Sequence, residues 1–436
     1  MDARSRLDVG TLIVDRQEAN DFRVARRVFT DPEIFELEMK NIFEGTWVFL
    51  AHESQLPKPH DFYTTQVGRQ PVVVSRDADG VVHCFFDACS HRGAKLMATK
   101  RGNKAVHMCY YHGWTYNSAG RCLGVREQDK GAYPACFTEL DHDLTPIARV
   151  DSYRGFVFGS LNPDVPELVD HLAEAKAMID LFADSSDQGL EVIRGCHTYT
   201  SRANWKIQLE NIDGYHFFPT HSCYVGQIQR RMAGDSANKL KAVDLRELAN
   251  LPSGSYDLGN GHVMDWGEMP NFEDRPLDFR RPEIVDRYGE RRARWMINRV
   301  RNLVLFPNLL LMDNASTTLR IIHPLAPDLT KCETYCIAPV GEPAEGRRLR
   351  LRQYEDFLGP AGQATPDDQS VMERCQQGFQ ATHVAWQQGY ARGSQNTVPG
   401  GDDDAKLLGI DPLFTSLGDT ETFCHGFYRQ WRELMT

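Results

Sequence analysis

Two pairs of cysteine and histidine residues carry the clearest chemical signal in this 436-residue chain. Cys89-x-His91 is followed, after seventeen intervening residues, by Cys109-x-x-His112. Two thiolates and two imidazoles are the ligands of a Rieske [2Fe–2S] cluster, in which two histidines replace two cysteines on one iron. The four residues therefore predict an electron carrier of raised potential, with imidazole edges near the surface where an electron can leave.

A zinc site of the Cys₂His₂ type is the competing interpretation of these residues. Zinc fingers usually pair cysteine with cysteine and histidine with histidine, whereas each pair here mixes the two, which suits two irons with unlike ligands. At this Cys and His content, chance would produce the pattern in on the order of 3 in 10,000 such chains. Gly93 and Gly113 let the loop backbone approach a cluster closely. Ala94 and Tyr111 stand where high-potential clusters have extra cysteines, so no bridging disulfide is expected.

A second candidate metal site begins with His216 and His221, which are five positions apart. Pro219 lies between them and is expected to end or kink a helix, which would bring both imidazoles to one metal. A 2-His-1-carboxylate set needs one more ligand and leaves positions open for O₂ and substrate. Asp367 and Asp368 are candidates, just ahead of a predicted helix. From the residues alone, capping is the commoner role of such acids, and a lone histidine is more often structural than a ligand.

The first site is expected to lie among short strands that follow an N-terminal helix. The sequence Asp31-Pro32-Glu33 predicts the start of this helix, which ends near Gly45. A predicted β-hairpin follows, with strands at 72–74 and 81–86, and similar short strands continue to Asn162-Pro163. We therefore expect a small all-β domain over 45–160 that carries both Cys/His pairs on loops.

The rest of the chain mixes helical and strand patterns and predicts an α+β domain with an antiparallel sheet. The expected helices are 167–182, 204–215, 347–358, 370–382 and 423–434, and the expected strands are 191–201, 303–312, 318–322 and 334–340. Residues 236–300 are polar and fit neither pattern, so they are expected to form surface excursions or a flap. No glycine-rich phosphate loop follows a strand, so the chain itself is not expected to bind NAD or FAD.

Composition narrows the class of protein. The chain has 49 Lys and Arg residues against 60 Asp and Glu residues, a net charge of −11, which argues against nucleic acid as a partner. Its 11 cysteines show no framework spacing and are expected to be reduced thiols. The polar N-terminus and the lack of a run of about 18 apolar residues predict a cytoplasmic protein without a membrane segment.

These motifs together resemble the large (alpha) subunit of Rieske non-haem iron aromatic-ring-hydroxylating oxygenases, over nearly the whole length. The matching motifs are Cys89/His91/Cys109/His112, Glu210-Asn211…Asp213…Tyr215-His216…His221, Gly359-Pro360-Ala361-Gly362…Asp367-Asp368 and Phe427-Tyr428-Arg429…Trp431. The resemblance implies three regions. An N-terminal segment, 1–44, packs on the catalytic domain, a Rieske domain covers 45–160, and a catalytic domain of helix-grip type covers 161–436.

The resemblance also implies roles for individual residues. Asp368 joins His216 and His221 as ligand of a mononuclear Fe(II), and Asp213 is the electron-transfer bridge between His216 and the cluster ligand His112 of a neighbouring subunit. The expected substrate-pocket residues lie beside the ligands, and core packing explains them equally well; they are Leu209, Asn211, Phe217, Phe218 and Ala364. A bulky aromatic is frequent in the family where this chain has Ala364.

The implied function is that of a terminal oxygenase in aromatic hydrocarbon catabolism. It would use O₂ and NAD(P)H-derived electrons, delivered by a separate reductase with or without a ferredoxin, and cis-dihydroxylation of an aromatic ring is the leading expectation. The alternatives are a Rieske monooxygenase that hydroxylates or dealkylates, and a pure electron carrier. The expected assembly is a homotrimer or α3β3 with a small beta subunit. An aromatic carboxylate as substrate would require a buried Arg or Lys, which the sequence alone does not place.

Overall fold

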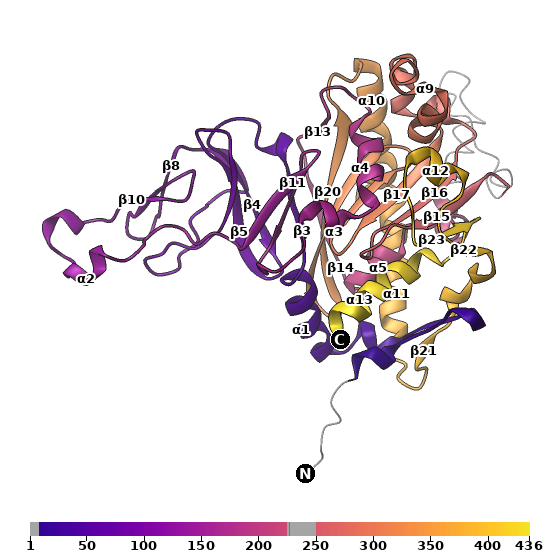
Figure 1. The fold of residues 1–436 in the computed structure, drawn as a ribbon, viewed down its shortest axis with the longest axis horizontal. Helices are drawn as coiled ribbons and strands as arrows, with labels where there is room; N and C mark the ends of the chain where they lie inside the picture. Colours follow the sequence, from indigo (N-terminus) through magenta and orange to yellow (C-terminus); the bar gives the residue numbers. More distant parts are fainter. Residues whose placement is uncertain (1–7, 225, 227–249) are drawn as a thin grey trace, which may run out of the picture. The chain divides into compact units, whose positions relative to one another are not determined.

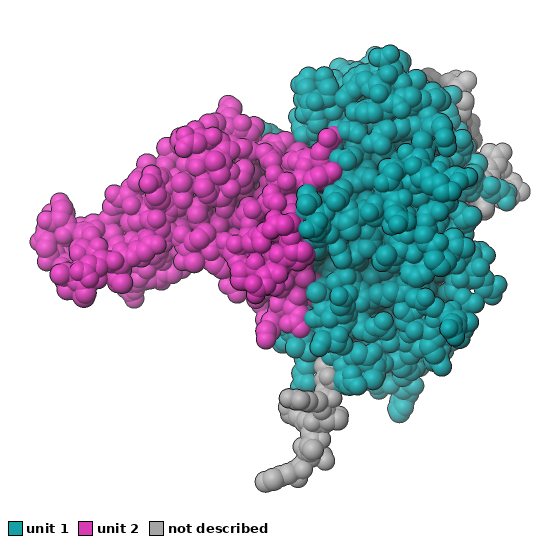
Figure 2. All heavy atoms as spheres, viewed as in Figure 1, with its two compact units in different colours: residues 1–38, 169–436 teal, residues 39–168 magenta. Residues whose placement is uncertain are grey.

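The computed structural model describes residues 8–224, 226 and 250–436, and for Phe218 only the backbone. The chain divides into two compact units, Met39–Leu168 and a larger one made of Met1–Glu38 with Val169–Thr436 (Figure 2). Among the described helices, none has both the length and the apolar character needed to cross a bilayer.

The smaller unit is built from short antiparallel strands, which confirms its expected all-β character (Figure 1). Its three sheets have the orders β6-β5-β4-β7, β10-β9-β8 and β11-β12-β3. The strands are β3 (Val48–His52), β4 (Asp61–Val67), β5 (Gln70–Arg76), β6 (Val82–Phe86), β7 (Arg101–Asn103), β8 (Val106–Met108), β9 (Thr115–Asn117), β10 (Cys122–Gly124), β11 (Arg149–Tyr153) and β12 (Phe156–Ser160). The predicted hairpin is β5–β6, with Val74 opposite Cys84. A short helix, α2 (Ala135–Thr138), lies between β10 and β11.

The larger unit contains a ten-stranded antiparallel sheet within the described residues, in agreement with the predicted α+β class. Its order is β13-β20-β19-β18-β17-β16-β15-β23-β22, with β14 also paired to β20. The strands are β13 (Leu190–Val192), β14 (His197–Ser201), β15 (Ser253–Asp257), β16 (Val263–Glu268), β17 (Arg299–Leu305), β18 (Leu309–Asp313), β19 (Thr317–Ala326), β20 (Leu329–Pro339), β22 (Thr397–Pro399) and β23 (Phe414–Leu417). A small sheet, β1 (Ile13–Arg16), β2 (Asp21–Ala25) and β21 (Trp386–Gln387), belongs to the same unit.

The helices of the larger unit cover both faces of the sheet. They are α1 (Pro32–Glu38), α3 (Leu168–Leu172), α4 (Ala175–Ala183), α5 (Trp205–Glu210), α6 (Phe217–Thr220), α9 (Arg281–Ile297), α10 (Ala344–Gln353), α11 (Thr365–Gly378), α12 (Asp403–Leu408) and α13 (Phe423–Met435). The predicted C-terminal helix is confirmed as α13, in which Phe423, Phe427 and Trp431 are buried on one face.

Alternation along the strands assigns side chains to two faces. Val304, Leu310 and Arg320 are cross-strand partners and share what we call the inner face. Asn302 is also on this face, and its side-chain amide donates to the Ile212 carbonyl (2.7 Å), while α5 packs on β19 and α11 on β14. Trp266 is on the outer face, against Trp295 of α9. The inner face therefore meets the segments that carry the predicted iron ligands.

Several predicted elements are shorter or split. The apolar run 303–312, predicted as one strand, is the turn region of the β17–β18 hairpin, because Pro307 has no amide for a ladder hydrogen bond. The predicted strand 191–201 divides into β13 and β14, which both pair with β20. The predicted helix 167–182 divides into α3 and α4 at Ala173, whose φ is +45°.

Two further predictions need correction. The predicted helix 204–215 ends at Glu210, because the next buried carbonyl, that of Ile212, accepts from Asn302 of the sheet instead of from a following helical turn. The unassigned stretch 236–300 is not a flap from residue 250 onward: it forms β15, β16 and α9, and both strands are central in the sheet. Residues 236–249 of that stretch lie outside the described residues.

Candidate metal centres

The two Cys/His pairs lie on loops of the same backbone geometry. In each loop the cysteine amide donates to the carbonyl five residues later, at 2.9 Å for Cys89 and 2.8 Å for Cys109. The glycine four residues after each cysteine donates back to the cysteine carbonyl, at 2.8 Å for Gly93 and 2.9 Å for Gly113. These glycines have φ values of +72° and +76°, which a side chain would disfavour. Each loop is therefore a tight turn that presents its cysteine and histidine together.

The ligand atoms of the two loops converge in a way that fits a [2Fe–2S] cluster. The Cys89 and Cys109 thiols are buried, and the His91 and His112 rings are partly exposed and 4.4 Å apart between centroids. The Nδ1 atom of His112 is buried and has no hydrogen-bond partner among the described residues, as expected of a ligand nitrogen. Burial and the neighbouring Cys109 raise the pKa of Cys89, so two adjacent thiolates at this place require nearby cations.

A hydroxyl group reaches one of these sulfurs. The Tyr116 hydroxyl lies 3.2 Å from Cys89 Sγ, and the Ser90 amide donates to the same hydroxyl oxygen (3.2 Å). Because the hydroxyl oxygen accepts the hydrogen bond of the Ser90 amide, the phenolic proton is directed toward the sulfur. Hydrogen bonds to cluster sulfurs are one of the means by which a protein sets the potential.

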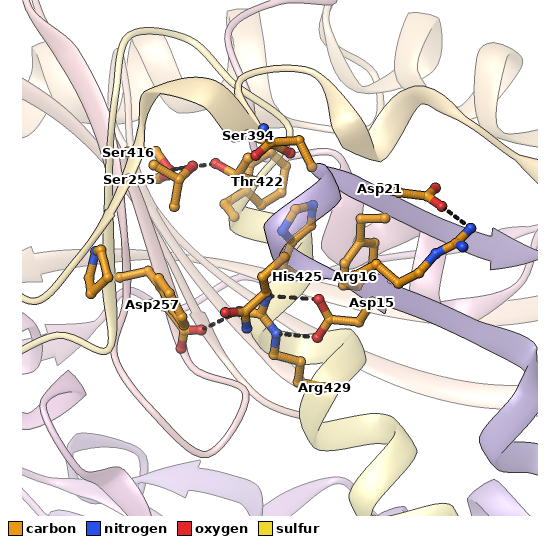
Figure 3. A pocket seen from close by; sticks show the side chains of 17 residues that line it. Asp15, Arg16, Asp21, Ser255, Asp257, Ser394, Ser416, Thr422, His425 and Arg429 are labelled. Carbon is orange, nitrogen blue, oxygen red and sulfur yellow. Dashed lines mark hydrogen bonds and ion pairs between the residues drawn. The ribbon is translucent and has the colours of Figure 1, made fainter.

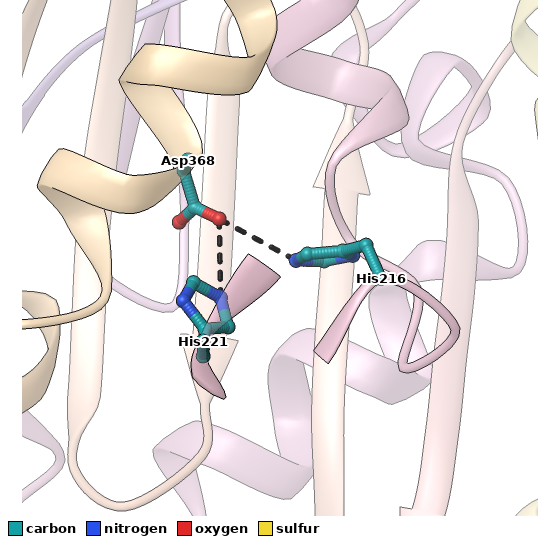
Figure 4. A group of neighbouring side chains, drawn as sticks. All are labelled: His216, His221 and Asp368. Atoms are coloured by element: carbon teal, nitrogen blue, oxygen red, sulfur yellow. Dashed lines mark ion pairs between the residues drawn. The ribbon is translucent and has the colours of Figure 1, made fainter. Parts of the chain in front are cut away.

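The second group of ligands comes from two distant parts of the larger unit. His216 precedes α6 and His221 follows it, and Asp368 lies in the first turn of α11. Figure 4 shows the Asp368 carboxylate pointing at both rings: its Oδ1 is 3.5 Å from His216 Nε2 and 3.2 Å from His221 Nε2. The ligand atoms of the three residues all lie within 4.8 Å of one another, and this is the donor set of non-haem Fe(II).

The local reason for this convergence differs from the prediction. Pro219 does not kink a longer helix; it is the third residue of the single-turn α6, where its missing amide would have had no helical partner. One turn thus separates the histidines, and the His221 amide donates to the Phe217 carbonyl (2.9 Å). The helix predicted over 370–382 begins at Thr365, so Asp368 is inside it, where the N-terminal dipole favours a carboxylate.

Each histidine also has a carboxylate at its other ring nitrogen. Asp213 Oδ1 is 2.6 Å from His216 Nδ1, and Asp367 Oδ2 is 3.6 Å from His221 Nδ1. Burial opposes the charge on His216, but the hydrogen bonds and charges of Asp213 and Asp368 raise its pKa to about 10. The site therefore has the negative potential that a cation requires, and its residues fit a divalent metal. Asp213 thus holds the His216 ring by a hydrogen bond, whereas Asp367, the other ligand candidate of the sequence, lies at ion-pair distance from His221 Nδ1 without a hydrogen bond among the described residues.

The expected pocket residues lie in different environments. Leu209 is fully buried in α5, and Ala364 is buried immediately before α11. Phe217 has its ring centroid 5.5 Å from that of His221. Asn211 caps the C-terminus of α5, and the side chain of Phe218 lies outside the described residues. Phe357, which no sequence motif singled out, has its ring centroid 6.0 Å from that of His221.

A cavity of about 210 Å³ elsewhere in the larger unit is a weaker candidate (Figure 3). Its charged groups pair with one another: Arg429 binds Asp15 (2.8 Å), and Arg16 pairs with Asp21. Ser416 and Thr422 likewise share a hydrogen bond (2.5 Å). The charged groups of the lining are therefore neutralised within it, although the Ser394 hydroxyl, also in the lining, has no hydrogen-bond partner among the described residues.

Comparison with known proteins gives two family matches and close relatives. Residues 46–151 match the family described as Rieske [2Fe-2S] domain, and residues 191–436 match that described as ring hydroxylating alpha subunit (catalytic domain). The chain is 41% identical to toluate 1,2-dioxygenase subunit alpha of Pseudomonas putida, over 98% of this chain and 94% of the relative. It is 40% identical to the anthranilate 1,2-dioxygenase large subunit of Acinetobacter baylyi, over 95% and 89% of the two chains. The 2-halobenzoate 1,2-dioxygenase large subunit of Burkholderia cepacia is 41% identical, over 91% and 85%.

Solved structures agree with these matches. Naphthalene 1,2-dioxygenase with indole bound in the active site has a TM-score of 0.79 and 27% identity, over 95% of this chain and 92% of that chain. The naphthalene 1,2-dioxygenase from Rhodococcus sp. bound to indole has a TM-score of 0.80 and 26% identity, over 95% and 94%.

Proposed function

Because the chain belongs to the family of Rieske ring-hydroxylating oxygenase alpha subunits, we propose that it is the terminal oxygenase that cis-dihydroxylates an aromatic ring. The observation that carries the proposal is that one chain holds both donor sets: the two-Cys, two-His loops and the His216/His221/Asp368 group within 4.8 Å. An electron carrier alone would have no use for the second set.

The proposed reaction adds both atoms of O₂ to one ring. Two adjacent ring carbons each form a C–O bond, one C=C bond of the ring and the O–O bond are lost, and two electrons and two protons balance the product. The mononuclear Fe(II) supplies O₂ activation, and the [2Fe–2S] cluster supplies electrons. Dihydroxylation is favoured over the monooxygenase alternative because the relatives at 40 to 41% identity are named 1,2-dioxygenases.

The chain's own residues have defined tasks in this proposal. Cys89 and Cys109 hold one iron of the cluster, and His91 and His112 hold the other. His216, His221 and Asp368 would hold the mononuclear iron, and such a three-residue set leaves positions for O₂ and substrate. The two histidines come from the ends of α6 and the acid from the first turn of α11.

Asp213 is proposed as the electron-transfer bridge. It holds the His216 ring through Nδ1 (2.6 Å), which fixes the ring and raises its basicity. Its pairing partner on the cluster side would be His112 of a neighbouring subunit. This role requires an oligomer, and we propose a trimer of this chain, with or without a small beta subunit.

The proposed organisation keeps 45–160 as the cluster domain and 161–436 as the catalytic domain, with 1–44 packed on the latter. Packing of the N-terminal segment is supported by Asp15, which pairs with Arg429 of α13 (2.8 Å), and by Phe22, which stacks on His425 (3.8 Å between centroids). The names "subunit alpha" and "large subunit" of the relatives support partner subunits, and the electron donor is a separate reductase, with or without a ferredoxin, in the cytoplasm.

Substrate-dependent oxygen uptake tests the function. The purified holoenzyme, supplied with a reductase system, should consume O₂ and release a cis-dihydrodiol in equal amounts when given an aromatic ring, and it should contain about three irons per chain. A colourless zinc protein, or uptake of O₂ without a hydroxylated product, would contradict the proposal.

A further inference from the structure

Arg320 is a buried cation on the inner face of the catalytic sheet. Its side chain is 1% exposed, and it lies on β19 opposite Leu310 and Thr334. Its Nε and Nη1 atoms are buried and donate no hydrogen bond within the described part of the chain. A guanidinium is always charged in proteins and has five N–H donors in a fixed fork, so this arrangement leaves a charge and several donors unmet.

The other buried arginines of the described residues show what a structural role looks like. Each forms an ion pair with a carboxylate at 3.4 Å or less; the pairs are Arg275–Asp313, Arg280–Glu283, Arg299–Glu268, Arg301–Asp313 and Arg350–Glu342. A buried ion without a partner destabilises a fold by several kcal/mol. Arg320 differs from these five arginines because, within the described residues, it forms no such ion pair, and an ion pair is what makes a buried charge tolerable.

The surroundings of Arg320 place this unmet charge at the proposed iron site. Asp368, Tyr199, Cys332 and Tyr354 are all close enough to interact electrostatically with its guanidinium. Asp368 is directed at His216 and His221, at 3.5 and 3.2 Å, so its charge serves the metal rather than Arg320. The Tyr199 hydroxyl is also buried and has no nitrogen or oxygen partner among the described residues.

From this geometry, and resting on the proposed function, we propose that Arg320 is the specificity-determining residue that binds the carboxylate of an aromatic acid substrate. A carboxylate matches the guanidinium fork with two parallel N–H···O bonds and neutralises the buried charge. The Tyr199 hydroxyl can donate a further hydrogen bond to the same group. The rest of the inner face offers apolar side chains to the ring, among them Val304 and Leu310, which are both fully buried.

The alternative is that Arg320 only balances the charge of Asp368. That role predicts an ion pair of the kind that the other buried arginines form, and the Asp368 carboxylate is instead aimed at two imidazoles (Figure 4). Bound metal would further neutralise Asp368. A charge-balancing Arg320 and a substrate-binding Arg320 also respond differently to substitution, which allows a direct test.

Binding of benzoate and of its neutral analogue benzamide to the iron-loaded full chain separates the two roles. Wild type should bind benzoate at least about 30-fold more tightly than benzamide, and Arg320→Met should lose that preference, because breaking a buried charge pair costs about 2 kcal/mol or more. Arg320→Lys should retain part of it. Arg348→Met, which removes a charge from a side chain that is 73% exposed, is the matched control and should bind like wild type.

Thermal unfolding of the substrate-free protein is the second measurement. Removing a buried, unpaired charge should leave the melting temperature of Arg320→Met equal to or above that of wild type. A clear fall in melting temperature, or equal binding of benzoate and benzamide by wild type, overturns the proposal. If neutral rings such as toluene are dihydroxylated without any preference for benzoate, the proposed function stands and this inference fails. If benzoate binds through Arg320 but no ring is hydroxylated, the proposed function fails instead.

Discussion

The two metal centres of this chain are assembled in opposite ways. The proposed cluster ligands all lie within residues 89–112, on two loops with the same pattern of backbone hydrogen bonds. The proposed mononuclear site takes two histidines from either end of a single-turn helix and its acid from α11, far along the chain. The first centre is determined by local sequence, whereas the second exists only once the sheet and its helices have formed.

The two centres also differ in the charged groups that surround them. The Tyr116 hydroxyl reaches the Cys89 sulfur, and neither cluster loop holds a carboxylate. The mononuclear site concentrates Asp213, Asp367 and Asp368 around two imidazoles. A thiolate cluster carries its own negative charge and is tuned by donors, whereas a hard divalent cation needs anionic oxygen near it.

Substitution of one ligand at each centre should have the largest effect and should separate the two. Asp368→Ala removes the acid shared by both imidazoles, so turnover should fall to background and iron should drop from about three to about two per chain. The visible spectrum of the cluster should stay unchanged. The reciprocal variant, Cys109→Ala, should lose the cluster absorption and keep the mononuclear iron. Loss of both metals in either variant would mean that the centres are not independent.

The carboxylates behind the histidines should give the next largest effect. Asp213→Asn should retain both metals but lower kcat about 10- to 100-fold or more, because Asp213 contacts His216 Nδ1 at 2.6 Å and is the proposed bridge. Asp367→Asn should cost less, since its oxygen is 3.6 Å from His221 Nδ1. Iron analysis and steady-state kinetics measure both variants side by side. Equal losses in the two variants would remove the bridging role and leave only ring orientation.

The same contrast explains how far the sequence could be read. Cys89, His91, Cys109 and His112 were predictable because their spacing alone brings them together. Asp368 could not be chosen over Asp367 from the residues, since both follow Pro366 in one helical turn and only the family resemblance favoured the second acid. Arg320 carried no signal at all: a strand arginine looks solvent-exposed until the fold shows that it is buried and that its Nε and Nη1 atoms have no hydrogen-bond partner among the described residues.

A smaller effect should follow from the hydroxyl that reaches the cluster. In Tyr116→Phe, Cys89 loses a donor at 3.2 Å, so the reduced, more negative cluster is less stabilised and the potential should fall. One hydrogen bond of about 1 kcal/mol corresponds to about 40 mV for one electron. Redox titration of the cluster spectrum measures the shift. Tyr133→Phe is the control, because Tyr133 stacks on Phe137 beside the cluster (4.1 Å between centroids) without a recorded contact to a ligand sulfur. An unchanged or higher potential in Tyr116→Phe would contradict the assigned donor direction.

The last expected effect is on stability alone and concerns the long-range support of the mononuclear site. Glu210 ends the helix before Asp213 and accepts hydrogen bonds from the hydroxyls of Tyr390 (2.7 Å) and Tyr428. Burial raises the pKa of Glu210 from 4.5 to about 7, against the opposing effect of the two tyrosines. Between those values the unfolded chain loses the Glu210 proton while the folded chain keeps it, so this residue's contribution to stability falls as pH rises and is lost above about pH 7.

Glu210→Gln keeps both acceptor contacts and removes the titration. Its melting temperature relative to wild type should therefore rise between pH 4.5 and 8, by an amount equivalent to at most about 3 kcal/mol, which corresponds to several degrees for a unit of this size. Glu345→Gln, at a side chain that is 71% exposed, should show no such trend. Calorimetry across this pH range measures the difference, and because only the larger unit contains Glu210, the transition that shifts should be the one that releases mononuclear iron. If the unfolding transition that releases the [2Fe–2S] cluster shifted instead, the cluster site would depend on packing around Glu210 in the larger unit.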